Sequence, residues 1–323
     1  MHDLKAFFLV GPTAAGKTSV SQWIAERHPY DILSADAMMV YRGMDIGTAK
    51  PEKTLRAGVR YWGLDLVPPR SAFSVGRYRE HALAAIRAAT APDRRMIVTG
   101  GTGLYIKSLT HGLTLLPAAN AALREEAEAL FQKSGLGALQ EWAKTLAPEQ
   151  YEALADKQNP RRLVRAVETA QNSVARQGGG WRLLGKGPKI TGLAMPKEML
   201  CERIKQRVDE MYAKGLLAET ERLLKDNLSA GDAPASGLEF SPTAGKAIGY
   251  AEAIAFLRGQ MPLEKARELT IARTCRLAKR QMTWFRNQAN VEWVTINPGT
   301  TIARTAQMVL ECWEKTGPAP ISV

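Results

Sequence analysis

The chain has 323 residues, of which 45% are hydrophobic and 24% charged, which excludes a disordered chain and fits a globular protein of two domains, or of one domain with an insertion. No apolar run is long enough to span a membrane and no secretory signal is visible, so we expect a cytoplasmic protein without a membrane partner. The formal net charge of +12 favours a polyanionic partner, although a generally basic surface would give the same value.

The first predicted elements enclose a phosphate-loop motif. Residues 5–10 are almost wholly apolar and predict a buried strand, and residues 18–27 predict a helix. The motif consists of two glycines separated by four residues and followed by a lysine and a hydroxyl residue. Its residues are Gly11, Pro12, Thr13, Ala14, Ala15, Gly16, Lys17 and Thr18. The backbone N–H groups, the positive end of the helix and the lysine bind phosphates, and the hydroxyl can bind Mg²⁺. The alternative is a glycine turn that binds nothing.

Later strands predict an α/β fold. Residues 31–35, 96–99 and 189–195 read as further strands separated by helices. Strands that alternate with helices form a parallel sheet flanked by helices, here P-loop NTPase-like. Because ligands bind beyond the carboxyl ends of such strands, we expect Gly11, Asp36 and Gly100 to meet at one crevice.

A mostly helical insertion domain is predicted at residues 116–187. We expect its helices at 123–134, 136–145 and 161–173, and flexible glycine-rich exits at 178–180 and 185–188. The core domain then comprises residues 1–115 and 188–323. Its later elements are helices at 197–214, 216–227, 243–258 and 262–287, and a last strand at 291–296.

Three groups near the crevice are candidates for chemistry. Asp36 is either a base, or the holder of a metal-bound water, or else an ordinary turn or cap residue. The glycine-rich residues 100–103 are a second candidate anion nest. Arg203 and Arg207 share one face of a predicted helix, as a phosphate clamp or as a solvated ridge in which Glu210 pairs with Arg207.

Basic residues gather in two segments, the pattern expected for contacts with a phosphate backbone. Residues 269–291 contain no acidic side chain but include Arg273, Arg276, Lys279, Arg280 and Arg286. The second group is Lys157, Arg161, Arg162 and Arg165. Trp284 and Phe285 could stack on a nucleobase, but helical spacing favours a core position for Trp284.

The cysteines predict neither a zinc site nor a disulfide framework. Cys201, Cys275 and Cys312 are odd in number, far apart in the sequence and without a CxxC pair. This usage is typical of a reducing compartment.

Beyond the phosphate loop, five blocks of sequence resemble the tRNA dimethylallyltransferases, also called tRNA isopentenyltransferases, of the IPP transferase family. The blocks are residues 36–51, 100–105, 159–168, 248–250 and 278–286, and they extend over nearly the whole chain. The resemblance implies transfer of a dimethylallyl group from dimethylallyl diphosphate to N6 of the adenine on the 3′ side of the anticodon, with Mg²⁺ and release of diphosphate. It also implies that the phosphate loop binds a prenyl diphosphate rather than ATP.

Residue roles follow from the same resemblance. Asp36 is the implied general base, Thr18 the ligand of Mg²⁺ or diphosphate, and Lys17, Thr102 and Arg207 the groups that stabilise the leaving diphosphate. The reacting adenine is expected to flip out of the anticodon loop. We expect a monomer whose tRNA contacts include Asp36, Met39, Tyr41, Lys157, Gln158, Arg161, Arg162, Arg165, Arg276, Lys279, Arg280, Gln281 and Arg286.

The chain departs from the family pattern at three places. Ala37 stands where the family usually has serine, Trp62 lies where a histidine is usual, and Cys275 replaces an arginine. Three other functions stay open: a small-molecule kinase that uses ATP, prenyl transfer to free adenine nucleotides, and an RNA-binding nucleotide switch. The switch would need a guanine-specifying Asn-Lys-x-Asp motif, which the sequence lacks.

Overall fold

A computed structural model describes residues 4–89, 94–113, 120–154, 156–171, 185–229 and 240–323. The chain divides into two compact units, one formed by Met1–Gly112 with Gly185–Val323 and the other by Leu113–Leu184. The insertion predicted from the sequence, residues 116–187, begins and ends three residues later than this second unit. The glycine-rich residues 178–180 lie outside the described residues.

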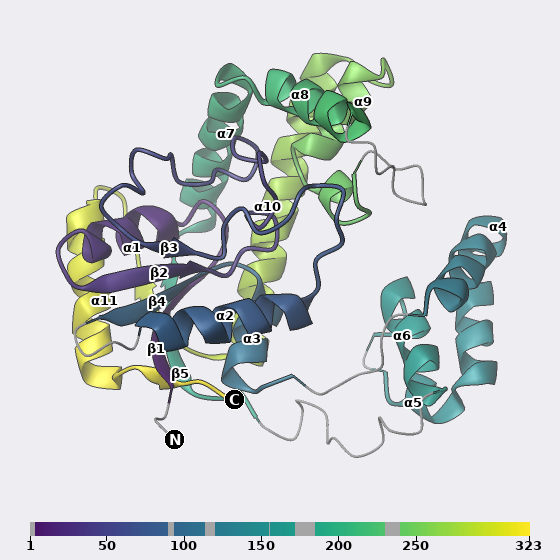
Figure 1. Cartoon of the computed structure of the whole chain (residues 1–323), viewed down its shortest axis with the longest axis horizontal. Helices are drawn as coiled ribbons and strands as arrows, with labels where there is room; N and C mark the ends of the chain where they lie inside the picture. Colours follow the sequence, from purple (N-terminus) through teal and green to yellow (C-terminus); the bar gives the residue numbers. More distant parts are fainter. Residues whose placement is uncertain (1–3, 90–93, 114–119, 155, 172–184, 230–239) are drawn as a thin grey trace. The chain divides into compact units, whose positions relative to one another are not determined.

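The first unit is built on a parallel sheet in the order β3-β2-β4-β1-β5-β6 (Figure 1). The confirmed α/β class follows from these strands and the helices between them. The short β7, Ala319–Pro320, pairs antiparallel with the start of β1. The parallel strands are β1 (Lys5–Val10), β2 (Tyr30–Ser34), β3 (Tyr61–Trp62), β4 (Arg95–Gly100), β5 (Lys189–Ala194) and β6 (Asn290–Thr295).

Alternating side chains of β1 feed two separate cores, because successive residues of a strand point to opposite faces. Phe8 and Val10 are buried among residues of α2 (Val75–Ala89) and α3 (Gly103–Thr110). Phe7 and Leu9 are buried among residues of α1 (Lys17–Ala25) and α11 (Ile302–Thr316). The strand is therefore apolar throughout, as a sheet covered on both faces requires.

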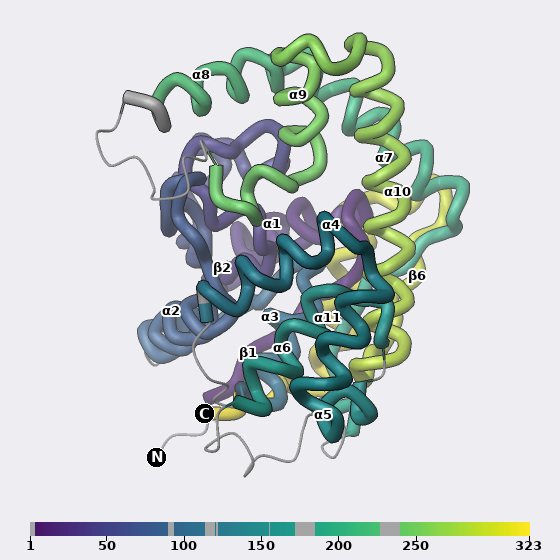
Figure 2. The backbone as a smooth tube through the Cα atoms, turned by 90° about the vertical axis from the view of Figure 1, so that its right-hand side faces the viewer, coloured from purple at the N-terminus to yellow at the C-terminus, as the bar shows by residue number. Residues whose placement is uncertain are grey.

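Two long helices pack against each other beside the sheet. Figure 2 shows α7 (Lys197–Ala213) running along α10 (Leu263–Gln288), and Ile204 and Ala278 lie in their common core. In this seam the Cys275 thiol donates to Cys201 with 3.9 Å between the sulfur atoms, so two cysteines that are distant in the sequence meet. All three cysteines are free thiols.

The expected single helix over residues 243–258 is wrong. The segment forms a 3₁₀ turn at Ala244–Lys246 and then α9 at Tyr250–Leu257. Gly249 separates them with a φ of 92°, a conformation that ends a regular helix. The preceding helix α8 spans Leu216–Ser229.

The second unit contains α4 (Ala121–Leu146), α5 (Pro148–Glu152) and α6 (Pro160–Ala170). Gly135 breaks α4 with a φ of 74°, which confirms the two expected helical stretches on either side of it. Asn159 caps α6 by accepting from the Arg161 N–H, and Pro160 begins the helix. Leu139, Leu163 and Val167 belong to this unit's own core.

No helix within the described ranges is long and apolar enough to cross a bilayer.

A buried carboxylate anchors the loop that follows Asp36. Glu219 of α8 accepts from the Ile46 N–H at 3.0 Å and from the Tyr250 hydroxyl at 2.5 Å. The same hydroxyl accepts from the Gly47 N–H at 3.1 Å. Burial raises the pKa of Tyr250, and the neighbouring Glu219 carboxylate adds to the shift. Tyr250 therefore stays a neutral donor that ties the loop to α8 and α9.

Replacing Tyr250 with phenylalanine should lower the free energy of unfolding by about 1–3 kcal/mol, because the buried Glu219 carboxylate and the half-buried Gly47 N–H lose a partner. Tyr78→Phe is the matched control, because the Tyr78 hydroxyl is buried with no hydrogen-bond partner among the described residues. We expect the control to leave stability unchanged or to raise it in urea titrations. Equal losses in both variants would contradict this account of the loop.

Candidate functional site

The phosphate loop has the backbone of an anion cradle. Gly11 adopts a φ of 140°, and a Cβ there would lie 2.6 Å from the Leu193 carbonyl oxygen. Gly16 is the N-cap of α1 with a φ of 87° and offers no side chain to the first turn of the helix. The N–H groups at the start of α1 are therefore available to an anion at the positive end of the helix.

Lys17 brings a cation to this cradle. Its ammonium donates to the Pro12 carbonyl at 2.6 Å, which folds the side chain back over the loop. The pKa of the Lys17 ammonium is lowered from the usual 10.5 to about 7, mainly because the group is buried. The Asp36 carboxylate opposes this shift, and the Arg207 guanidinium adds to it. Lys17 is thus a desolvated cation whose charge a bound anion would stabilise.

Helix α7 brings Arg203 and Arg207 to the same place. Both line one cavity with Lys17, and Arg207 donates to the Thr48 carbonyl at 3.2 Å. Burial lowers the pKa of Arg207, while the Asp36 and Glu210 carboxylates act in the opposite direction. This geometry favours the clamp over the solvated ridge, and no ion pair joins Arg207 to Glu210 within the described part of the chain.

Asp36 lies just beyond β2, in the position predicted from the parallel sheet. Its Oδ1 accepts from the Met38 N–H at 2.9 Å, so the residue does form a turn. The other carboxylate oxygen makes no hydrogen bond to any residue that the structure describes. Because Asp36 also lines the cavity, the turn and a role as proton acceptor are compatible.

Thr102 supports the Asp36 segment. Its N–H donates to the Ala35 carbonyl at 3.1 Å, and its hydroxyl accepts from the Ala37 N–H at 3.0 Å. Both neighbours of Asp36 are thereby held by one residue of the loop after β4. Thr102 is not among the described residues that line the cavity, so a direct contact with diphosphate stays a prediction.

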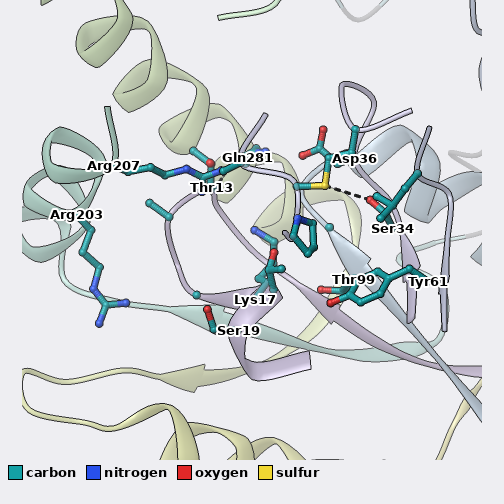
Figure 3. Close-up of a pocket in the computed structure, with 18 of the residues that line it drawn as sticks. Thr13, Lys17, Ser19, Ser34, Asp36, Tyr61, Thr99, Arg203, Arg207 and Gln281 are labelled. Carbon is teal, nitrogen blue, oxygen red and sulfur yellow. Dashed lines mark hydrogen bonds between the residues drawn. The ribbon is translucent and has the colours of Figure 1, made fainter. Parts of the chain in front are cut away.

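The cavity measures about 390 Å³, and Figure 3 shows Lys17, Arg207 and Asp36 among the residues that line it. The phosphate loop and α7 supply Thr13, Lys17, Thr18, Arg203 and Arg207. Apolar surface comes from Met39, which the sequence analysis had assigned to tRNA, and from Ala49, Pro51 and Leu64, which it had not assigned. All except Leu64 lie in the 36–51 block, so the family resemblance of that block was the sequence feature that could have identified them.

Two buried tyrosines, Tyr78 and Tyr105, are affected by the charge of the Asp36 carboxylate. The rings of Tyr78 and Tyr105 stack with centroids 3.8 Å apart. Burial is the main cause that raises the pKa of both hydroxyls. The pKa of Tyr78 is raised further by Tyr105 and by the Asp36 carboxylate. The pKa of Tyr105 is raised further by Tyr41 and by the Asp36 carboxylate. These groups therefore remain neutral close to Asp36.

The donor set suits a metal that is held mainly by a substrate. No group of three or more His, Cys, Asp or Glu side chains that could hold a metal occurs among the described residues. Thr18 and Asp36 both line the cavity. Mg²⁺ commonly takes few protein oxygens, together with phosphates and water, so these residues fit it.

The RNA candidates on α10 differ in their surroundings. Arg276, Lys279, Arg280 and Arg286 are exposed, whereas Gln281 is half-buried. Arg273 instead forms an ion pair with the buried Glu252. Trp284 packs against the core beside Phe285, which favours the predicted core position over nucleobase stacking.

Tyr41 is a correction to the predicted RNA contacts. Its side chain is fully buried, so it cannot contact RNA directly in this structure. Met39 is buried too, but it lines the cavity and its sulfur accepts from the Ser34 hydroxyl at 3.5 Å.

The candidates in the second unit lie on α6 and just before it. Arg161, Arg162 and Gln158 are exposed. Lys157 is paired with Glu152 at 2.7 Å and Arg165 with the buried Glu168 at 2.6 Å. Arg161 and Arg162 are therefore the cations of this group most available to a polyanion.

Two departures from the family pattern have clear structural surroundings. The Trp62 indole donates to the buried Asp31 carboxylate at 3.1 Å, and its neighbour Gly63 donates to His81. Ala37 packs against the core that contains Tyr78.

Comparisons with known proteins identify the family of the chain. The family model described as IPP transferase matches residues 39–288. A tRNA dimethylallyltransferase of Acetivibrio thermocellus is 36% identical over 292 residues, which cover 88% of this chain and 90% of the relative.

Solved structures extend the similarity to three dimensions. The full-length tRNA isopentenylpyrophosphate transferase of Bacillus halodurans matches with a TM-score of 0.65 and 31% identity, covering 97% of this chain and 98% of that one. The enzyme of that kind from Staphylococcus epidermidis gives a TM-score of 0.65 and 28% identity, covering 96% and 99%. The resemblance proposed from the five sequence blocks is confirmed.

The pKa of Lys17 predicts proton uptake when an anion binds. Above pH 7 the free protein holds Lys17 increasingly neutral, and a bound pyrophosphate should raise its pKa. Pyrophosphate affinity should then fall as pH rises above 7, by at most about tenfold per pH unit from this residue. Calorimetry at pH 8 in buffers of different ionisation enthalpy measures the protons taken up.

Lys17→Arg is the matched control, because its guanidinium stays charged throughout this range. We expect the wild type to take up on the order of one proton more than the control. Identical uptake by the two proteins would contradict the lowered pKa.

Proposed function

Because the chain belongs to the IPP transferase family, we propose that it transfers a dimethylallyl group from dimethylallyl diphosphate to N6 of the adenine at position 37 of tRNA, 3′-adjacent to the anticodon. The observation that carries the proposal is the cavity in which two desolvated cations, Lys17 and Arg207, face the same space as the Asp36 carboxylate. One end suits a leaving diphosphate and the other a nucleophile that must lose a proton.

The donor is held by its diphosphate. The loop N–H groups and Lys17 bind its oxygens, and Arg207 adds a planar guanidinium suited to phosphate. As the bond between C1 of the dimethylallyl group and oxygen breaks, negative charge grows on the diphosphate. Cations positioned in a water-poor site stabilise that charge more than they stabilise the bound substrate, which accelerates the step.

Thr18 and the diphosphate oxygens would hold Mg²⁺, which supplies further positive charge to the leaving group when bound. Residues 11–16 shape the loop through their backbone. Met39, Ala49, Pro51 and Leu64 give the carbon chain an apolar wall.

The acceptor is a base taken out of its stack. The N6 nitrogen forms the new bond to C1, and the free oxygen of Asp36 accepts the proton that N6 loses, so charge balances with the departing diphosphate. An adenine within an anticodon loop reaches such a cavity only when flipped. Phosphate contacts from Arg276, Lys279, Arg280 and Arg286 on α10, and from Arg161 and Arg162 in the second unit, would hold the RNA.

The test is incubation of the protein with dimethylallyl diphosphate, Mg²⁺ and unmodified tRNA, followed by mass spectrometry of the nucleosides. The expected product is N6-dimethylallyl-adenosine, with one diphosphate released for each group transferred. ATP turnover without this product would instead support the kinase, and product formed only on free adenine nucleotides would support the second alternative.

Asp36→Asn sharpens this test, because asparagine keeps the acceptor for the Met38 N–H but cannot take a proton. We expect turnover to fall by about 10²–10⁴-fold, with tRNA affinity within about twofold of the wild type. Asp226→Asn on the exposed surface of α8 is the matched control and should leave both unchanged. Full activity of Asp36→Asn would remove Asp36 from the role of base.

A further inference from the structure

The side chain of Gln281 joins the two loops that form the floor of the cavity. Its Oε1 accepts from the Thr13 N–H of the phosphate loop at 2.8 Å. Its Nε2 donates to the Gly101 carbonyl of the loop after β4 at 3.0 Å. Figure 3 shows Gln281 beside Thr13. The carboxamide accepts through its oxygen and donates through its nitrogen, so one side chain can bridge an N–H group and a carbonyl group that belong to different loops.

The close approach is built into the sequence of the receiving loop. A Cβ at Gly101 would lie 2.2 Å from Nε2 of Gln281, and one at Gly103 would lie 2.3 Å from Cε3 of Trp284. Gln281 and Trp284 are three residues apart on α10 and therefore neighbours on one face of the helix. The two glycines let α10 seat both side chains on the loop.

The contact reaches both partners of the reaction. On one side Gln281 holds Thr13, next to the groups that bind the diphosphate. On the other side it holds Gly101, whose neighbour Thr102 fixes the backbone before and after Asp36. One side chain thus fixes the anion cradle relative to the carboxylate.

We propose that Gln281 is a positioning residue that aligns the donor cradle with Asp36, rather than one of the tRNA contacts that its sequence block suggested. The inference rests on the proposed function for its catalytic consequence. Because the exposed Lys279 and Arg280 adjoin Gln281 on α10, the helix that would bind RNA also sets the geometry of the donor site.

Gln281→Met tests the proposal, because methionine retains the length and loses both hydrogen bonds. We expect the single-turnover rate at saturating donor and tRNA to fall about 10–100-fold, since small misplacements of reacting groups are costly. The tRNA Kd should stay within about twofold of the wild type. Gln288→Met, the same change two turns along α10, is the matched control and should keep both values.

Two results would overturn the proposal. A tRNA Kd weakened about tenfold with the saturating rate preserved would make Gln281 an RNA contact. An unchanged rate and an unchanged Kd would leave it without a positioning role.

Gln281→Glu covers the case in which the methionine variant does not fold. Glutamate still accepts from the Thr13 N–H, cannot donate to Gly101, and places a negative charge beside the cradle. We expect inorganic pyrophosphate to bind to Gln281→Glu at least about tenfold more weakly than to the wild type. The matched control Gln288→Glu should bind pyrophosphate with wild-type affinity. Wild-type affinity in Gln281→Glu would contradict the bridge. This readout needs no prenyl transfer, so a wild type that makes no product would refute the proposed function without deciding the role of Gln281.

Discussion

The site depends on two half-buried cations that line the same cavity. Burial lowers the pKa of both Lys17 and Arg207, so the folded chain carries positive charge that is poorly solvated. Asp36 offsets part of this cost from across the cavity without a direct ion pair to either group within the described structure. A diphosphate supplies the missing negative charge, and its charge grows during the reaction. Binding and rate enhancement thus have the same electrostatic origin.

The parallel sheet explains why these groups meet. The phosphate loop follows β1, Asp36 follows β2, and the loop of Thr102 follows β4, so three carboxyl ends of neighbouring strands meet at one edge. Helices outside the sheet complete the arrangement: α7 contributes Arg207, and α10 contributes Gln281. The loop after Asp36 is fixed separately through Glu219 and Tyr250. Catalytic geometry is therefore held by hydrogen bonds between elements far apart in the sequence.

The sequence was sufficient where local pattern and topology decide the structure. The phosphate-loop motif and the strand periodicity placed Lys17 and Asp36 correctly. Bonds such as that between Thr13 and Gln281, 268 residues apart, leave no periodic signal, so the role of Gln281 was not predictable. Motif membership also says nothing about side-chain direction, which is why Tyr41 was wrongly assigned to the RNA surface. The break at Gly249 depends on a backbone angle that the helical composition around it concealed.

A structure of the protein with the slowly reacting dimethylallyl thiolodiphosphate, Mg²⁺ and an anticodon stem-loop RNA tests the central claim most directly. We expect the diphosphate within about 3 Å of the loop N–H groups, Lys17 and Arg207, with an extruded adenine placing N6 beside the free oxygen of Asp36. A diphosphate bound away from Lys17 and Arg207, or an adenine that remains stacked in its loop, would contradict the account.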